Sequence, residues 1–322
     1  MKVSRRSVLV GAMSAAALMP ARNAAAQQYP ARPIHIIVPF AAGGGSDIVA
    51  RLIGERLSKR LGQSVIVENK PGAGAVIGAD AVAKSAPDGY TLLYATPGPQ
   101  ILNPFLLPKL PYDPKDFAGV AMLVMSVNLL VVHPGMPTKT VRELIDYAKA
   151  NPGKLNFASS GIGTSSHLAG ELFKSMAKIE ITHVPYRGNA LALQDLLAGN
   201  VQMAIDAVSV LLPHVRSGGL RALGFATPEP NAVLPDIPPI AATLPGYDAS
   251  SINYISVRAG TPIDIIERLN REINAIMADS EMRARIIGLG LIPISETAAM
   301  LERRIVEEAQ KWKKVIEQMG SK

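Results

Sequence analysis

The stretch IHIIVPFAAGGGSDIVARLIGER, residues 34–56, constrains the fold more than any other part of the sequence. An apolar run from Ile34 to Phe40 predicts a buried strand, and the three glycines after it lead into a helical pattern that begins at Asp47. A strand, a glycine turn and a helix start together direct several backbone N–H groups at one point, where the helix dipole favours an anion. Because the spacing differs from G-x-G-x-x-G, the motif predicts a carboxylate or phosphate site rather than a dinucleotide site.

The residues that follow alternate between helix and strand patterns. Apolar spacing and breakers predict, in order, a helix, a strand, a helix and a strand over 47–61, 64–68, 75–84 and 90–96. With the first strand, this β-α-β-α-β order predicts a parallel sheet with right-handed crossovers. A proline-rich loop over 97–114 comes next, and the apolar stretch 119–132 predicts one long strand that runs between two domains.

The second half of the chain repeats this order. Its patterns predict strand 155–159, glycine loop 161–163, helix 165–177, strand 180–186, helix 189–198 and strands 201–207 and 220–227. Two similar α/β lobes with equivalent glycine loops suggest a ligand shared across a cleft. A proline-dense segment, 228–247, predicts an extended return, and helices are predicted to begin at Thr261-Pro262 and at Thr297.

The N-terminal residues 1–26 have the features of an export signal. A basic start with Arg5 and Arg6 precedes a short apolar stretch, and Ala24-Ala25-Ala26 fits an A-x-A cleavage site. The apolar stretch is shorter than the roughly 20 residues that a membrane-spanning helix needs. The paired arginines resemble a twin-arginine signal, and an uncleaved amphipathic anchor is the alternative. We therefore expect a periplasmic protein that is cleaved near Ala26.

Composition excludes several classes of site. Residues 1–26 contain four bases and no acids, so the remaining 296 residues carry 29 bases and 26 acids, which is no nucleic-acid footprint. The absence of cysteine excludes disulfides, thiolate nucleophiles and cysteine metal sites. None of the five histidines forms a close metal-binding spacing, so we expect no metal, no cofactor and no nucleic-acid partner. We expect a monomer.

The second glycine loop, Ser159 to His167, offers hydroxyls and bare N–H groups before another helix start. A charged carboxylate would gain roughly 1.5–3 kcal/mol from each hydrogen bond there, whereas helix capping alone accounts for only one of the three hydroxyls over 164–166. An alternative casts Ser165 or Ser166 as a nucleophile with His167 as its base. Neighbouring Ser and His side chains on one helical turn point apart, and no G-x-S-x-G elbow occurs, so we expect no catalytic residue.

Four further residues have both a structural and a ligand-binding interpretation. Asp47 would repel a carboxylate, so it either caps its helix, pairs with Arg51 or meets the ligand through a water. Tyr186 and Arg187 end an apolar strand and could reach the ligand cleft, or both could be ordinary strand-end residues. Asp206 lies near the end of another apolar strand, where ligands bind in open α/β sheets, and it either receives a ligand ammonium or hydroxyl or caps the next turn.

Several segments together resemble the Bug family, the extracytoplasmic receptors of tripartite tricarboxylate transporters. The matching segments, in family order, are YPARPIHIIVPFAAGGGSDIVAR, VENKPGAGAVIGADAVAKSAPDGYTLLYAT, LPYDPKDF, GIGTSSHLAGELF, HVPYRGNALALQDLLAGNVQMAID and VRAGTP. The chain departs from the family at Ile252-Asn253-Tyr254, where Trp-Phe-Gly is common, which implies a different pocket shape or closure.

The resemblance implies a type II periplasmic-binding-protein fold, an α/β fold with two domains around a ligand cleft. Domain 1 would comprise 27–127 plus 252–322, and domain 2 would comprise 128–251. It also implies that the ligand carboxylate lies between the two glycine loops and that the Asp206 position meets the far end of the ligand. The residues expected to form the ligand site are Phe40, Ala41, Gly43, Gly44, Gly45, Asp47, Thr96, Ser160, Gly161, Gly163, Thr164, His167, Tyr186 and Asp206.

The expected function is capture of a small carboxylate, such as a di- or tricarboxylate, an amino acid or an aromatic carboxylate. The receptor would close on this ligand and deliver it to the membrane subunits of a tripartite tricarboxylate transporter. Two alternatives remain: a periplasmic sensing subunit for a signalling kinase, and a serine hydrolase that uses the second loop.

Overall fold

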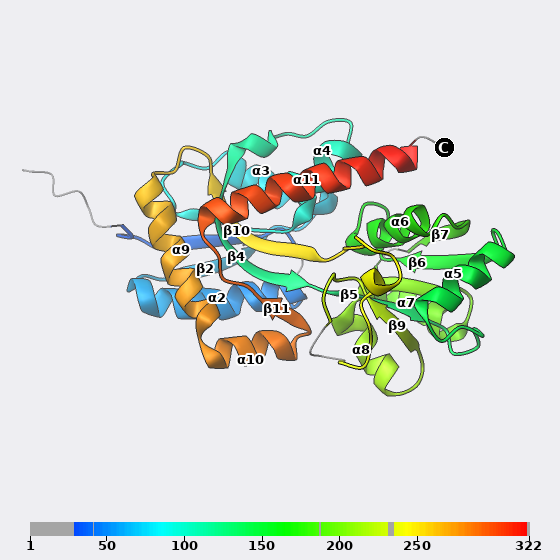
Figure 1. Cartoon of the computed structure of the whole chain (residues 1–322). Helices are drawn as coiled ribbons and strands as arrows, with labels where there is room; N and C mark the ends of the chain where they lie inside the picture. The colour runs from blue at the N-terminus through cyan, green and yellow to red at the C-terminus, as the bar shows by residue number, and fades with distance from the viewer. Residues whose placement is uncertain (1–28, 41, 187, 231–234, 321–322) are drawn as a thin grey trace, which may run out of the picture. The chain divides into compact units, whose positions relative to one another are not determined.

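The computed structural model describes residues 29–40, 42–186, 188–230 and 235–320 (Figure 1). The predicted export signal, Ala41 and Arg187 lie outside the described residues. Residues 32–322 form one compact unit that contains two β-sheets flanked by helices.

The first sheet has six strands in the order β11-β4-β10-β3-β1-β2. The strands are β1 (Ile34–Val38), β2 (Val65–Asn69), β3 (Thr91–Ala95), β4 (Phe117–Ser126), β10 (Ser251–Arg258) and β11 (Leu291–Pro293). Strand β1 pairs in parallel with β2 and β3, which confirms the predicted parallel unit. Strand β10 is antiparallel to β3 and β4, so the complete sheet is mixed.

The helices that accompany the first sheet come from the first and the last parts of the chain. They are α2 (Gly45–Leu61), α3 (Val76–Ala83), α4 (Asn103–Leu106), α9 (Ile263–Ala278), α10 (Ser280–Gly288) and α11 (Ala298–Gly320), with short turns η1 (Ala73–Ala75), η2 (Gly98–Leu102) and η3 (Pro114–Asp116). Helix α11 packs against β4 and η2 (Figure 1). Trp312 on α11 is 4% exposed and belongs to a hydrophobic core, so its ring packs inside the protein.

The second sheet has five strands in the order β7-β6-β8-β5-β9. The strands are β5 (Asn128–Val132), β6 (Leu155–Ser159), β7 (Ile181–Pro185), β8 (Met203–Ala207) and β9 (Arg221–Phe225), with helices α5 (Val141–Ala150), α6 (Ser165–Ala177), α7 (Asn189–Ala198), α8 (Val208–Arg216) and the turn η4 (Ile240–Ala242). Strand β6 is parallel to β7 and β8, whereas β5 is antiparallel to β8 and β9. Both sheets therefore combine a parallel core with an antiparallel crossover strand.

The single strand predicted over 119–132 is instead two strands in different sheets. Strand β4 pairs with β10 and β11, Val127 follows, and β5 then pairs with β8 and β9. Strand β4 is apolar and buried along most of its length, and β5 is buried throughout, so the change of partner leaves no mark in the hydrophobic pattern. The chain returns to the first sheet at β10.

Candidate functional site

One cavity of about 560 Å³ lies where several loops of the compact unit meet. Its walls come from the end of β1, the turn η1, the segment after β3, the second glycine loop, and the ends of β4 and β10. The lining residues are Phe40, Ser46, Ala73, Gly74, Ala75, Thr96, Pro97, Gly98, Leu102, Asn103, Leu106, Leu107, Ser126, Ile162, Gly163, Thr164, Ser165, Ser251 and Asn253.

The first glycine loop delivers the N-terminus of α2 to this cavity. Gly43 has a φ of +81°, which favours glycine, and Gly44 is the N-cap without a side-chain cap. Helix α2 begins at Gly45, two residues before its predicted start. The first N–H groups of a helix have no intrahelical partner, so the N–H groups around Ser46 are free to bind an anion.

Asp47 stabilises the first glycine loop through its carboxylate. Its carboxylate accepts hydrogen bonds from the Gly43 N–H at 2.8 Å, from Arg51 at 3.0 Å and from Asn69 at 2.9 Å. The hydrogen bond from Arg51, together with those from Gly43 and Asn69, lowers the pKa of Asp47 to about 2. Because the side chain is 3% exposed and fully engaged, Asp47 fixes the loop and does not line the cavity.

The second glycine loop delivers the N-terminus of α6 to the same cavity. Gly161 and Gly163 have φ angles of +134° and +79°. Thr164 is the N-cap: its hydroxyl accepts from the His167 N–H at 3.4 Å and donates to the Gly161 carbonyl at 2.6 Å. Ser166 Oγ accepts from the Ser160 N–H at 3.0 Å, so this loop is held by neutral groups.

Two stacked histidines lie behind the second loop. The His167 and His183 ring centroids are 4.1 Å apart. The Gly163 N–H donates to His167 Nδ1 at 3.1 Å, and His183 Nε2 is hydrogen-bonded to Ser159 Oγ at 2.6 Å. Burial lowers the pKa of both imidazoles to about 4. Both rings are therefore neutral at pH 7, and His167 acts as an acceptor for the loop backbone.

His167 offers no ligand atom for a metal ion in this arrangement, although Glu171 lies close to the histidine pair. Ligand atoms of His167, Glu171 and His183 lie within 4.8 Å of one another. Because His167 Nδ1 accepts from the Gly163 N–H, the proton of the neutral His167 ring sits on Nε2, and neither nitrogen of His167 has a lone pair left for a metal.

The serine and histidine side chains do not form a nucleophile and base. Ser166 Oγ contacts Ser160 and Thr164 rather than the His167 ring. Within the described ranges, the one serine hydroxyl bonded to a histidine ring is that of Ser159, which is fully buried and closed to a substrate.

The predicted site residues separate into three groups. Phe40, Thr96, Gly163 and Thr164 line the cavity. Gly43, Gly44, Gly45, Ser160 and Gly161 belong to the same two loops without lining it, and Asp47 and His167 support the loops from behind.

Tyr186 and Asp206 lie on the second sheet and do not line the cavity. The Tyr186 hydroxyl donates to Asp195 at 2.6 Å, and burial raises the pKa of Tyr186 to about 12. Asp206 accepts two hydrogen bonds of 3.1 Å from Asn189, and burial raises the pKa of its carboxyl to about 6. In this structure both side chains are engaged within their own lobe.

Sequence reasoning did not identify the turn η1 or the start of β10 as parts of the cavity. Ala73, Gly74 and Ala75 all have positive φ angles, between 48° and 75°, and this strained turn faces the cavity. The Asn103 amide donates to the Gly74 carbonyl at 3.1 Å. The Gly-Ala-Gly repeat after Pro71 was the available signal. Asn253, at the position where the chain departs from the Bug pattern, also lines the cavity.

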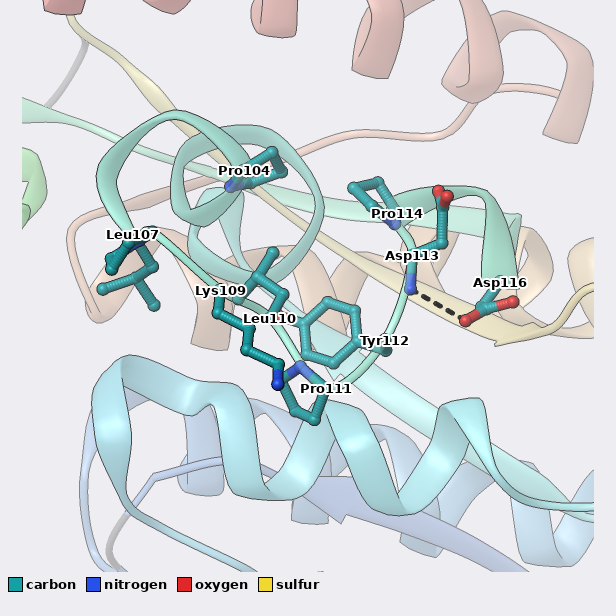
Figure 2. Close-up of a pocket in the computed structure, with 10 residues that line it drawn as sticks. Pro104, Leu107, Lys109, Leu110, Pro111, Tyr112, Asp113, Pro114 and Asp116 are labelled. Atoms are coloured by element: carbon teal, nitrogen blue, oxygen red, sulfur yellow. Dashed lines mark hydrogen bonds between the residues drawn. The ribbon is translucent and has the colours of Figure 1, made fainter.

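A second hollow lies on the segment from Pro104 to Asp116, and Figure 2 shows its ten lining residues. Asp113 and Asp116 there accept each other's backbone N–H groups, the dashed line marking one of these bonds, and Asp116 also pairs with Arg258 at 2.6 Å. One continuous segment, from α4 to η3, forms the whole hollow and places two carboxylates in it. The cavity between the glycine loops is therefore the better anion site.

None of the helices in the described part of the chain has the length and apolar character that a bilayer crossing requires. A family profile described as "Tripartite tricarboxylate transporter family receptor" matches residues 49–321. Protein BugT of Bordetella pertussis is 36% identical, over 100% of this chain and 99% of BugT.

Two solved structures are similar in both sequence and fold. R. palustris Rpa4515 with adipate is 35% identical, with a TM-score of 0.80 over 91% of this chain and 98% of Rpa4515. MatC (Rpa3494) from Rhodopseudomonas palustris with bound malate is 34% identical, with a TM-score of 0.75 over 89% of this chain and 100% of MatC.

Proposed function

Because the chain belongs to the tripartite tricarboxylate transporter receptor family, also called the Bug family, we propose that it captures a small carboxylate in the cavity between its two glycine loops. It then delivers this ligand to the membrane subunits of such a transporter. Members of the family are non-enzymatic solute-binding receptors with this periplasmic-binding-protein-like fold.

The observation that carries the proposal is that the N-termini of α2 and α6 border one cavity. Ser46 in the first turn of α2, and Thr164 and Ser165 at the start of α6, all line it. Each helix end offers unpaired N–H groups and a partial positive charge. A carboxylate between them gains charge-assisted hydrogen bonds of about 1.5–3 kcal/mol each, so no cationic side chain is required.

Two relatives support the chemical class of this ligand. Rpa4515 holds adipate and MatC holds malate, and both share about a third of their residues with this chain. Both ligands are carboxylates of a size that a cavity of about 560 Å³ accommodates.

The proposed mechanism is closure of two lobes, one built on each sheet. The lobes are residues 27–127 with 252–322, and residues 128–251. A ligand that contacts both glycine loops binds the closed arrangement more tightly and shifts the population toward it. We further propose that the protein works in the periplasm after cleavage near Ala26, as the sequence of residues 1–26 indicates.

A thermal-shift screen of the purified, ligand-stripped protein against carboxylates and their amides tests the proposal. A true ligand at 100 times its Kd adds about 2.7 kcal/mol to the free energy of unfolding. At about 2–4 °C per kcal/mol, the melting temperature then rises measurably. A shift with a carboxylate and none with its amide is expected. A folded protein that responds to no carboxylate contradicts the proposal.

The variant Gly44→Asp tests the location of the site. Gly44 is the N-cap of α2, with φ −76° and ψ 167°, a conformation that aspartate adopts readily. Asp is a favoured N-cap residue, so folding is retained, while its charge lies where the ligand carboxylate binds. We expect binding to be lost at unchanged or higher stability; retained binding would place the site elsewhere.

A further inference from the structure

Helix α11 packs beside the first sheet at its start and reaches a helix of the second sheet further along (Figure 1). At its start, a Cβ placed on Gly119 of β4 would lie 3.1 Å from Leu301 Cδ2. Further along, an open hollow of about 460 Å³ separates Lys311, Lys314 and Val315 of α11 from Leu172, Ser175 and Met176 of α6. We call this contact between residues 307–315 and residues 172–176 the α6–α11 seam. It joins the two proposed lobes outside the ligand cavity.

One part of the α6–α11 seam is apolar and buried. Leu172 is 9% exposed and Val315 is 5% exposed, and both belong, with Trp312, to a hydrophobic core that contains residues of both sheets. Met176 packs against the same core. Apolar surface that is hidden between the two helices returns to water when they separate. The contact therefore favours the arrangement in which α6 and α11 touch.

A polar contact ties both helices to the segment that leads back to β10. Lys311 Nζ lies 3.7 Å from a carboxylate oxygen of Asp248 in that segment. The neighbouring residue, Tyr247, is fully buried, and its hydroxyl donates to the Ala169 carbonyl of α6 at 2.9 Å. Its ring also meets the Phe173 ring edge-on, with the centroids 6.1 Å apart. The returning segment thus contacts α6 through Tyr247 and α11 through Asp248.

Helix α6 connects the seam to the ligand cavity. Ser165, its first residue, lines the cavity, and the seam residues Leu172 to Met176 follow two to three turns later, about 10–17 Å along the helix. The helix is packed tightly on its own sheet, because a Cβ placed on Gly170 would lie 2.2 Å from a ring carbon of Phe157 on β6. A shift at the seam therefore moves the N-terminus of α6 together with the second sheet.

In this structure the seam is formed while residues of both glycine-loop segments line one cavity. We propose that the α6–α11 seam positions the N-terminus of α6 for ligand binding, with Lys311 and Val315 as positioning residues that do not contact the ligand. Because the seam stabilises the arrangement that binds the ligand, it raises affinity from a distance, and bound ligand in turn favours the seam. The proposal rests on the proposed function and adds a determinant of its affinity.

The distance between the lobes of the ligand-free protein tests the seam without any ligand. Because the sequence contains no cysteine, two introduced cysteines can be labelled specifically with a pair of fluorescent dyes. Lys59→Cys in the last turn of α2 and Lys149→Cys in the last turn of α5 place one dye beside each sheet. In single-molecule energy transfer, we expect Lys311→Gln/Val315→Ala to broaden the distance distribution relative to the parent protein.

Isothermal titration with adipate, the ligand of Rpa4515, measures the effect on affinity. We expect Lys311→Gln/Val315→Ala to weaken adipate binding at least fivefold. The matched control is Lys313→Gln/Val141→Ala, which removes the same charge and the same methyl groups away from the seam. Lys313 has an exposed pair with Glu317 at 3.8 Å, and Val141 is 3% exposed at the start of α5. The control is expected to change neither affinity nor the distance distribution.

Each variant is first shown to be folded by its melting temperature, and Lys311→Gln alone, at a side chain 27% exposed, is measured if the double variant does not fold. Unchanged affinity or an unchanged distance distribution in the folded seam variant overturns the proposal, as does an equal loss of affinity in the control. If the wild type does not bind adipate, the ligand-free distances alone decide. Absence of binding by every carboxylate of the thermal-shift screen contradicts the proposed function instead.

Discussion

The two glycine loops present the same element to the cavity, a helix N-terminus, but they are held by opposite kinds of chemistry. The first is fixed by the ionised Asp47, whose carboxylate bonds to Gly43, Arg51 and Asn69. The second is fixed by neutral groups, Thr164, Ser166 and the uncharged His167. Only the backbone geometry at the helix start is common to both, so an anion site of this kind does not depend on one particular set of supporting side chains.

The largest expected effect comes from breaking the support of the first loop. Asp47→Ala leaves the Gly43 N–H and the Asn69 amide without their acceptor, and we expect a loss of about 3 kcal/mol in the free energy of unfolding. Carboxylate affinity falls at least tenfold because the loop is no longer fixed. Denaturant unfolding and isothermal titration measure the two effects. The control Glu55→Gln removes an exposed pair with Lys59 and is expected to change neither.

The second loop is expected to respond to pH where the first does not. The folded-state pKa of His167 is about 4 against 6.5 when unperturbed, so the unfolded chain binds more protons below pH 6.5. Stability from the neutral ring is therefore present above pH 6.5 and is lost as pH falls toward 4, by about 2–3 kcal/mol. The pKa of Asp47 is about 2, against 3.8 for an unperturbed carboxyl. The stability that ionised Asp47 contributes is therefore lost only as the pH falls below 3.8.

Comparison of the protein with His167→Asn isolates this effect, because asparagine can accept the Gly163 N–H without titrating. Asp206, whose pKa is raised to about 6, has the opposite sign: its contribution is lost as pH rises from 3.8 to 6, and it is common to both proteins. Unfolding free energies from pH 7 to 4 should fall more steeply for the wild type. Parallel curves would show that His167 does not titrate in this window.

A matched pair of helix caps separates the stability of a loop from ligand binding. Thr164 caps α6 beside the cavity, and Thr140 caps α5, where it accepts from the Glu143 N–H at 3.1 Å. We expect Thr164→Ala and Thr140→Ala each to cost about 1 kcal/mol of stability. Only the first should weaken carboxylate binding. Equal affinities in the two variants would remove Thr164 from the site.

The smallest stability effect is expected at Gly45, where a substitution should change stability and ligand affinity in opposite directions. Its φ is not in the left-handed region, and a Cβ there would meet no atom within 4 Å, so folding alone does not require glycine. Gly45→Ala should raise stability by about 0.5 kcal/mol and reduce affinity by blocking the approach of the ligand. Gly288→Ala on α10, also in open space, should raise stability and leave binding unchanged. Unchanged affinity in Gly45→Ala would mean that the ligand does not approach this glycine.

The sequence allowed the order of most elements to be predicted because glycine and proline mark their ends. Gly62, in the left-handed region, ends α2 as expected, and the parallel unit of β1, β2 and β3 was predicted with errors of one or two residues. The change of sheet at Val127 was not predictable, because burial on both faces removes the alternation that would show it. Helix α8 was missed because Pro213 lies inside it.

The residues that line the candidate cavity were predictable in the glycine loops and less so elsewhere. Glycine runs before helices identify N–H groups that face a cavity, and this led to Gly163 and Thr164. The lining residues Leu102, Leu106 and Leu107 lie within the proline-rich segment 97–114, whose short helices have no sequence period. Asn253 was noticed as a departure from the family but not as a lining residue, because only pairing in the sheet brings β10 beside β3.

The most direct test of the central claim is to follow the backbone amide signals of both glycine loops by NMR during titration with a carboxylate. We predict that the amides of Gly44, Gly45 and Ser165 shift together, with one Kd, and that the corresponding carboxamide produces no such shifts. Shifts confined to one loop, or two different dissociation constants, would contradict the claim that both helix N-termini converge on a single carboxylate.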